Sequence, residues 1–583
     1  MKIIIFDFEV FRYNCLLGCY LVNEKRYFQT WEQSEIRKFY YDNLDAIWIG
    51  HNNGDYDNFI LQAVIKNQNV FKVSQDIINK TKRYYLDIKL NSYDIIQSHF
   101  TSLKVIEAAV GKNISESEVD FNLNRPLTDE EKRLTESYNR DDLNQTFEDL
   151  KLTKSEFQLR LDLIKEFKLP IDALHYTETQ IAESVLKAEP IRNIENMPVK
   201  PVLYSQLKVS NEEALNYYLN EKFKTSEKLT VTLCGLPHKM GAGGMHAGRE
   251  CCHYDWAYYF DVSGYYNLVM INYNLLSRTI SDEGKKLYEY MYHEQLRLKK
   301  INPVKRAIYK VILLAVFGAQ MNKHCKFYDP WNGALVPVVG QMFLIDLLEK
   351  LEGKVELIQS NTDGIIAYPL VEESELIDIV NEWQNRTGFT LKMDKIYDIH
   401  QRDVNNYMYR DDKGNIHVKG EAVGYYERWE NPLLANSYNS KEPIIIHYCI
   451  VNYLMNNIKP ERTIVDYADN LRMFQYICKP QSYDYLTFED SSGSHTLQKI
   501  NRCFASKESG MIYKNKKDRH DKYSNLPDRV FVYNGDLKDL DRKKIDFRYY
   551  AIRAYERINE FQPNAFQKKV VEKKNEESTL LNI

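Results

Sequence analysis

Four acidic residues near the amino terminus have the types and spacing that a divalent-metal site needs. Asp7 and Glu9 lie two residues apart in Lys2–Phe11, a β-rich run in which alternate side chains share one face. Asp57 follows an apolar strand at the start of a predicted helix, and Asp142 lies on a later helix. Neighbouring carboxylates repel each other unless a cation lies between them, and carboxylate ligands favour Mg²⁺ or Mn²⁺ over zinc. The set therefore predicts a magnesium or manganese site.

Each of these acidic residues also has a purely structural interpretation. An acid-x-acid pair can belong to a solvated strand face, and Asp57 can simply cap its helix. The helix with Asp142 opens with a capping box, Thr128-x-x-Glu131, and carries Tyr138 one turn before Asp142. Such a helix can be charged and exposed without any further role.

A second acidic pair lies further along the chain. Asp261 ends a segment of strand composition, and Asp363 lies in Asn361-Thr-Asp-Gly, between two short apolar strands. A carboxylate at a strand end can reach a metal ion. Asp-Gly between apolar runs is also the strongest hairpin signal in a sequence, so this pair has a structural alternative as well.

The segment between the two aspartates is predicted to form a helical hairpin. Residues 283–300 are amphipathic, Asn302-Pro303 interrupts the pattern, and residues 304–318 form a second helix. Arg306 and Lys310 lie one turn apart on one face of that second helix. Two cations there can hold a triphosphate in line for attack, or they can be basic residues on a solvated face.

In their order along the chain, the later segments resemble the motifs of family B DNA polymerases, most of all the compact polymerases of bacteriophages. Asp261-Val-Ser-Gly-Tyr-Tyr-Asn resembles motif A (D-x-x-S-L-Y-P), Lys310-x6-Phe-Gly resembles motif B (K-x3-N-S-x-Y-G), and Asn361-Thr-Asp-Gly is similar to motif C (D-T-D-S). The resemblance implies that Asp261 and Asp363 bind two catalytic metals. It also implies that Tyr266 rejects a ribose 2′-hydroxyl and that Lys310 contacts the incoming triphosphate. Arg306 is a second candidate for that contact because it lies on the same helix face as Lys310.

The amino-terminal segments resemble the three motifs of DnaQ-like 3′-to-5′ exonucleases. Asp7-x-Glu9 is similar to the first motif, Asn52-x3-Tyr-Asp57 to the second, and Tyr138-x3-Asp142 to the third. The resemblance implies that the four acids hold two divalent metals, one activating a water and the other stabilising the leaving oxygen of a phosphodiester. Tyr138 would help to position that water.

The polymerase motifs also depart from the family pattern. The departures are Gly264 and Asn267 in motif A, Leu314 and Ala315 in motif B, and Asn361 in motif C. Asparagine brings no charge, so only Asp261 and Asp363 are assigned as indispensable palm acids. The departures leave a second interpretation open, an exonuclease whose polymerase half is retained only as a DNA-binding scaffold. A third is a replication adaptor without enzymatic activity.

Two further segments are candidates for DNA contact. Gly243 and Gly244 belong to a glycine cluster whose backbone can approach a phosphate chain, at the place of the family's template-contacting segment; a flexible turn is the alternative. Tyr407 and Lys419 fall where the family places residues near the primer terminus, although a strand tyrosine and an exposed hairpin lysine explain them equally well.

A local basic stripe is also expected near the carboxy terminus. It comprises Arg502, Lys507, Lys514, Lys516 and Lys517, with Phe504 and Tyr513 between them. This pattern is compatible with binding the phosphates of a nucleic acid, and a solvated charged loop is the alternative.

Composition sets the broad class. A chain of 583 residues is too long for a single core, and its net charge of -4 gives no global positive field, so any DNA path must be local. Nine scattered cysteines lack zinc-ribbon spacing and are expected to be reduced. No signal-like segment and no apolar run of membrane length is found, so we expect an intracellular, cytoplasmic protein, in the host cytoplasm if it is viral.

The fold class expected is α+β and multi-domain, with a right-hand polymerase preceded by an RNase H-like α/β exonuclease domain. The expected divisions are an exonuclease domain (1–150), a connecting region with the glycine-rich loop (151–249), palm (250–282 and 323–430), fingers (283–322) and thumb (431–583). We expect template-directed DNA synthesis with proofreading, two Mg²⁺ or Mn²⁺ ions at each site, and dNTP substrates. Primer-template DNA is the expected partner of a monomer, with replisome accessory proteins as possible further partners.

Overall fold

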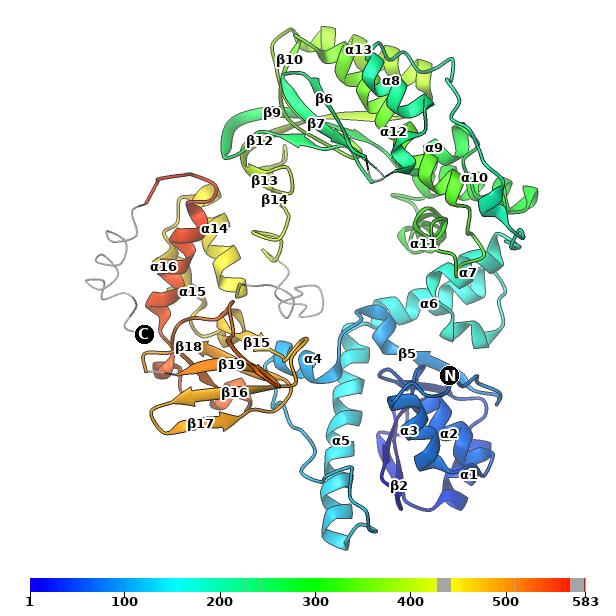
Figure 1. Cartoon of the computed structure of the whole chain (residues 1–583), viewed down its shortest axis with the longest axis vertical. Helices are drawn as coiled ribbons and strands as arrows, with labels where there is room; N and C mark the ends of the chain where they lie inside the picture. Colours follow the sequence, from blue (N-terminus) through cyan, green and yellow to red (C-terminus); the bar gives the residue numbers. More distant parts are fainter. Residues whose placement is uncertain (226, 242, 427–441, 509, 567–580, 582–583) are drawn as a thin grey trace.

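The computed structural model describes residues 1–583 except 226, 242, 427–441, 509, 567–580 and 582–583. It is a mixed α/β chain with several separate hydrophobic cores, as its length requires. Figure 1 shows the amino-terminal part in blue, the middle of the chain in green, and the carboxy-terminal part in yellow to red. The expected thumb is therefore described only from residue 442 onwards, and without its last segment.

The amino-terminal part is built around a mixed five-stranded sheet of order β3-β2-β1-β4-β5. β1 pairs antiparallel with β2 and parallel with β4. Alternate residues of β1 enter different cores: Phe6 and Phe8 face one, while Ile5 packs on the other face with Leu143. The strands are β1 (Ile3–Val10), β2 (Cys15–Leu21), β3 (Arg26–Thr30), β4 (Ile47–Gly50) and β5 (Asn91–Asp94). The helices are α1 (Gln33–Tyr41), α2 (Asp57–Ile65), α3 (Val70–Ile78), α4 (Leu103–Val110) and α5 (Asp129–Leu152).

The middle of the chain holds an antiparallel seven-stranded sheet of order β14-β13-β12-β9-β11-β10-β8. One large core joins this sheet to the surrounding helices, and the almost wholly buried α12 runs through that core. The strands are β8 (Ala247–Gly248), β9 (Cys252–Val262), β10 (Val355–Asn361), β11 (Gly364–Pro369), β12 (Leu391–Asp403), β13 (Asn406–Arg410) and β14 (Ile416–Lys419). The helices are α9 (Tyr265–Asn272), α12 (Pro330–Leu351) and α13 (Glu373–Thr387).

The expected helical hairpin is present as α10 (Asp282–Arg297) and α11 (Pro303–Ala319). Asn302 caps α11 by accepting a hydrogen bond from the Lys305 amide, and Pro303 fills the first turn, where its missing N–H costs nothing. The hairpin packs on the segment that follows the amino-terminal sheet, which includes α6 (Lys154–Glu166), α7 (Glu178–Val185), α8 (Glu212–Leu219), β6 (Leu229–Leu233) and β7 (Leu236–Met240).

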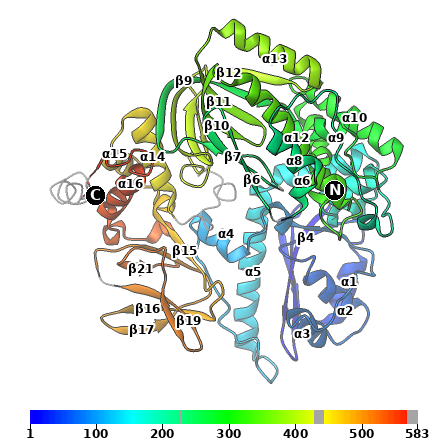
Figure 2. The ribbon, with the colours of Figure 1, turned by 45° about the horizontal axis from the view of Figure 1, so that its top comes forward.

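The carboxy-terminal part combines three helices with two small sheets around one core. The helices are α14 (Ile444–Asn456), α15 (Pro460–Tyr467) and α16 (Phe547–Ile558). The strands are β15 (Tyr476–Cys478), β16 (Tyr485–Asp490), β17 (Gly493–Thr496), β18 (Asn501–Ala505), β19 (Met511–Lys516), β20 (Arg519–Lys522) and β21 (Val530–Val532). Figure 2 shows this part beside α4 and α5 of the amino-terminal part. Within the described residues, no helix combines the length and apolar character needed to cross a bilayer.

Candidate active sites

Three of the amino-terminal acids converge at one place. Asp7 and Glu9 project from β1 toward α5, which carries Asp142, and one carboxylate oxygen of each lies within 4.8 Å of the other two. Asp57 begins α2, and its Oδ1 accepts a hydrogen bond of 3.0 Å from the amide of Phe8, between the two β1 acids. The alternation of β1 and the spacing of α5 thus place all four acids around one end of the strand.

Burial and mutual repulsion make this cluster costly to ionise. Burial raises the pKa of Asp7 well above its usual value, and the charges of Glu9, Asp57 and Asp142 raise it further. Burial likewise raises the pKa of Asp57 to about 7. A divalent cation relieves both penalties because it supplies compensating charge to oxygen ligands. The donor set, all carboxylates, therefore fits Mg²⁺ or Mn²⁺.

Asn139 fixes one of these carboxylates at close range. Its Nδ2 donates a hydrogen bond of 2.8 Å to Asp7 Oδ2. The residue paired with Asp7 on β2 is Gly18, where an added Cβ would lie 1.7 Å from Asn139 Oδ1. Gly18 therefore leaves the space that lets α5 approach β1 closely enough for this contact.

Lys104 on α4 is a site residue that the sequence reasoning missed. Its ammonium lies 2.6 Å from Asp142 Oδ1 and 3.1 Å from Glu107 Oε1, and it sits 4.7 Å from the centre of the Tyr138 ring. Burial disfavours the charged form, yet Asp142 and Glu107 outweigh it and raise the pKa of Lys104. A lone lysine in an apolar helix carries no motif, so only the fold reveals that it enters the site.

The second acidic pair also meets in space. Asp261 on β9 is paired in register with Gly364, the residue after Asp363, and the Val262 amide donates a hydrogen bond of 2.9 Å to the Asp363 carbonyl. Burial raises the pKa of Asp363, and the charge of Asp261 raises it further. Two acids that lie far apart in sequence are thus adjacent in the fold, Asp261 near the end of β9 and Asp363 in the two-residue turn between β10 and β11.

The structure gives physical reasons for two departures from the family motifs. Gly264 caps α9 with φ of 63°, and an added Cβ would lie 2.8 Å from Cε2 of Tyr292, so serine does not fit there. Asn361 Oδ1 accepts a hydrogen bond of 2.8 Å from the Thr362 amide and so stabilises the turn that presents Asp363.

A cavity of about 210 Å³ opens beside Asp363, between α9 and α11. The rings of Tyr266 and Phe317 lie 4.6 Å apart along it. Leu314 also lines it and is 63% exposed, so the motif B departure gives this wall an apolar surface. On the same helix Lys310 is exposed, while Arg306 is half-buried and its Nε has no hydrogen-bond partner among the described residues.

The predicted DNA-contacting residues lie around the same turn. Gln341 Nε2 donates to the carbonyls of Gly241 (2.8 Å) and Gly243 (3.0 Å), which holds the glycine-rich loop against α12. An added Cβ on Gly244 would lie 2.1 Å from Thr362 Oγ1, so this loop packs directly on the turn with Asp363.

Tyr407 and Lys419 are paired in register on β13 and β14, but their exposure differs. Tyr407 is buried and Lys419 is exposed. Lys419 acts on both Asp261 and Asp363, because its charge lowers the pKa of each against the larger effect of burial. Lys419 is thus open to a ligand, whereas Tyr407 contributes to the sheet core.

The basic stripe expected near the carboxy terminus is wrong at two positions of β18, Arg502 and Phe504, both of which are buried. Arg502 is 0% exposed and donates to carbonyl groups inside the protein, so it cannot grip a phosphate on the surface. Burial on β18 explains the error, because a strand residue faces inward or outward according to register, which charge alone does not reveal.

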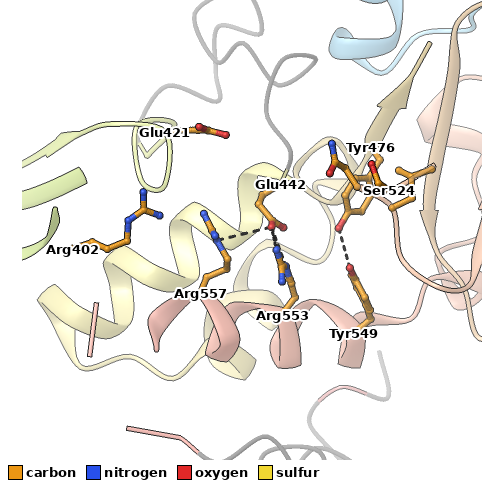
Figure 3. Close-up of a pocket in the computed structure, with 10 residues that line it drawn as sticks. Arg402, Glu421, Glu442, Tyr476, Ser524, Tyr549, Arg553 and Arg557 are labelled. Carbon is orange, nitrogen blue, oxygen red and sulfur yellow. Dashed lines mark hydrogen bonds and ion pairs between the residues drawn. The ribbon is translucent and has the colours of Figure 1, made fainter. Parts of the chain in front are cut away.

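Another cavity, of about 400 Å³, lies between Arg402 of β12, Tyr476 of β15 and the side chains of α16 (Figure 3). Its arginines are already paired: Arg553 and Arg557 with Glu442, and Arg402 with Glu560. None of the sequence-predicted site residues lines it. We therefore interpret this cavity as a junction between two parts of the chain that is held together by salt bridges.

Comparison with known proteins adds little to this geometry. No family model matches the chain, and no curated protein matches it. One solved structure that is similar to it is the family B DNA polymerase from the hyperthermophilic archaeon Pyrobaculum calidifontis, at 13% identity and a TM-score of 0.41. The overlap covers 97% of this chain and 78% of that chain. At this identity and score the likeness does not establish a shared fold, so the function must be inferred from the sites themselves.

Proposed function

We propose that this protein is a template-directed DNA polymerase with its own 3′-to-5′ proofreading exonuclease. The observation that carries the proposal is the register that sets Asp261 beside the Asp363 turn, next to a helical hairpin with an exposed Lys310. A separate four-carboxylate site in the amino-terminal part supports the editing activity. The mixed five-stranded sheet supports an RNase H-like exonuclease domain. The seven-stranded sheet and the hairpin support a palm and fingers, followed by a thumb.

At the polymerase site, Asp261 and Asp363 would hold two divalent cations, which when bound supply the charge that activates a primer 3′-hydroxyl and stabilises the leaving pyrophosphate. The protein's own residues bind and orient the nucleotide. Lys310 offers an exposed ammonium to the triphosphate, and Tyr266, packed on Phe317, closes the side of the cavity where a ribose 2′-hydroxyl would enter.

At the exonuclease site, Asp7, Glu9, Asp57 and Asp142 would hold two further cations, which when bound activate a water and stabilise the leaving oxygen. Asn139 keeps the Asp7 carboxylate in place. Lys104 balances the charge of Asp142 and lies against the Tyr138 ring, which orients that tyrosine toward the acids. Single-stranded or frayed 3′ ends of DNA are the substrates that this editing role requires.

Both activities can be tested on one labelled primer-template, with and without dNTPs. We expect Asp142→Ala to abolish 3′ degradation and to retain extension, and Asp363→Ala to do the reverse. Matched controls are Asp141→Ala and Asp255→Ala, exposed acids on the same helix and on β9, which should retain both activities. If the degradation-deficient protein added no nucleotide with Mg²⁺ or Mn²⁺, the polymerase assignment would be wrong and the nuclease with a DNA-binding scaffold would replace it.

A further inference from the structure

Helix α4 has one end in the exonuclease site and the other in the carboxy-terminal part. Lys104, in its first turn, contacts Asp142 at 2.6 Å. The helix is only eight residues long and ends at Gly111, which takes a left-handed conformation with φ of 82°. A helix rises about 1.5 Å per residue, so its last turn lies roughly 6 Å beyond Lys104. Both views of the ribbon show α4 against the strands of the carboxy-terminal part (Figures 1 and 2).

Arg502, from β18, holds the last turn of α4. Its Nη2 donates to the carbonyls of Ala108 (3.0 Å) and Lys112 (2.8 Å). Its Nε donates to Gln475 Oε1 and its Nη1 to the Gly535 carbonyl, both at 2.8 Å. One guanidinium thus ties the end of α4 to two segments of the carboxy-terminal part.

The side chain of Arg502 is fully buried. Burial lowers its pKa to about 10, against the opposite effect of the Asp536 charge, so it is still charged at neutral pH. The charge is offset by Asp536 and by carbonyl oxygens at the negative end of the α4 dipole, which favours a cation. A buried cation in this setting requires these acceptors to stay in place, so the position of α4 and that of Arg502 are mutually fixed.

Neighbouring contacts fix the same helix end. Arg472 Nε donates to the Ala109 carbonyl at 3.0 Å, and the Leu537 amide donates to the Gly111 carbonyl at 2.9 Å. The Ile114 amide donates to the Asn534 carbonyl at 2.8 Å. The carbonyls that a helix C-terminus leaves unsatisfied are thus met here largely by the carboxy-terminal part.

We propose that Arg502 is a positioning residue for the editing site, which sets Lys104 against Asp142 by holding the far end of α4. This inference rests on the proposed exonuclease function. The carboxy-terminal part thereby completes a catalytic site that lies in the amino-terminal part. The editing reaction depends on this docking, and the polymerase site, which makes no contact with α4 in the described residues, does not.

The test compares Arg502→Met with wild type in the full-length protein, using a labelled single-stranded DNA for degradation and a primer-template for extension. We expect the degradation kcat to fall about tenfold or more while extension stays within twofold of wild type. Arg502→Lys keeps a charge but cannot reach all four acceptors, so its degradation kcat should lie between that of wild type and that of Arg502→Met. The matched control is Arg462→Met, which changes an exposed arginine of α15 whose side chain pairs with Asp466 and with no other described residue; it should leave both rates unchanged.

A second comparison separates action through Lys104 from a general loss of structure. If Arg502 acts through Lys104, then Arg502→Met added to Lys104→Ala should slow degradation little beyond Lys104→Ala alone. The proposal would be overturned if the two substitutions together slowed degradation by the product of their separate effects. Loss of extension and of a cooperative thermal unfolding transition would show that Arg502→Met does not fold. In that case Arg472→Met provides the same comparison, and we expect it to lower the degradation rate by only a few-fold.

The outcomes also separate this inference from the proposed function. If wild-type protein did not shorten the 3′ ends of DNA, the exonuclease assignment itself would be wrong. Wild-type protein that degrades DNA, together with an Arg502→Met protein that degrades it equally fast, would overturn the positioning role alone.

Discussion

Removal of divalent metal should make the stability of the amino-terminal part depend on pH in a specific direction. Burial raises the pKa of Asp57 from 3.8 to about 7, so the folded, metal-free protein holds this proton more tightly than the unfolded chain does. The stabilisation is fully present below the unfolded value of 3.8 and is lost as the pH rises through about 7. We therefore expect metal-free protein to lose stability between pH 5 and pH 8.

The size of the effect follows from the shift. About three pKa units at about 1.36 kcal/mol each give a ceiling of about 4 kcal/mol, of which about 3 kcal/mol falls between pH 5 and the folded pKa of about 7. One kcal/mol moves Tm by roughly 2–4 °C in a unit of 150–250 residues, so the change between pH 5 and pH 8 is at most roughly 6–12 °C. Asp7 and Glu9 shift in the same direction and add to the trend.

The assay is thermal unfolding of the full chain in EDTA at pH 5, 6, 7 and 8. Buried histidines such as His400 and His447, whose pKa values are lowered to about 4 and about 3 by burial, oppose the trend at the acid end. The quantity to compare is therefore the pH dependence of wild type minus that of Asp57→Asn. Asp55→Asn, an exposed acid in the same turn, is the matched control and should behave as wild type.

Added Mg²⁺ or Mn²⁺ should restore Tm at pH 8 and do little at pH 5, because protons compete with the metal for the carboxylates. The reasoning would be refuted if Asp57→Asn showed the same pH dependence as wild type in EDTA. It would equally be refuted if the cations raised Tm by the same amount at both pH values.

Two further changes test single contacts at the two sites. Gly18→Ala places a Cβ 1.7 Å from Asn139 Oδ1, so it should displace the amide from Asp7. Loss of a charge-assisted hydrogen bond of about 1.5–3 kcal/mol should slow 3′ degradation roughly 10- to 100-fold with extension retained, and an unchanged rate would contradict it. Tyr266→Ala should weaken discrimination against ribonucleotides by about 10²-fold in competing extension assays, whereas the same change at Tyr290, an exposed tyrosine of α10, should not. Equal discrimination in both proteins would contradict the proposal that Tyr266 rejects a ribose 2′-hydroxyl.

Local pattern was enough to predict the strands and turns that carry the acids. The alternation of Lys2–Phe11 put Asp7 and Glu9 on one face, and β1 places both toward α5. The capping box at Thr128 is present with both of its reciprocal hydrogen bonds. These features depend on neighbours within a few residues, so the sequence contains them directly.

Residues that enter a site from a separate element could not be predicted in the same way. Lys104 reaches Asp142 only because α4 packs beside α5, and Arg502 reaches α4 across 390 residues or more of chain. Neither residue has a spacing partner that would single it out. The need for glycine at position 264 could not be predicted from the sequence either, because it arises from contact with the Tyr292 ring, which lies on α10.

The packing of α11 against α6 has a mechanical consequence. Lys305, in the first turn of α11, forms an ion pair of 2.9 Å with Glu166 at the end of α6. Tyr309, one turn later, donates a hydrogen bond of 3.3 Å to the same carboxylate. These two contacts hold the hairpin to α6. Any movement of the hairpin must therefore either carry α6 with it or break the ion pair between Lys305 and Glu166.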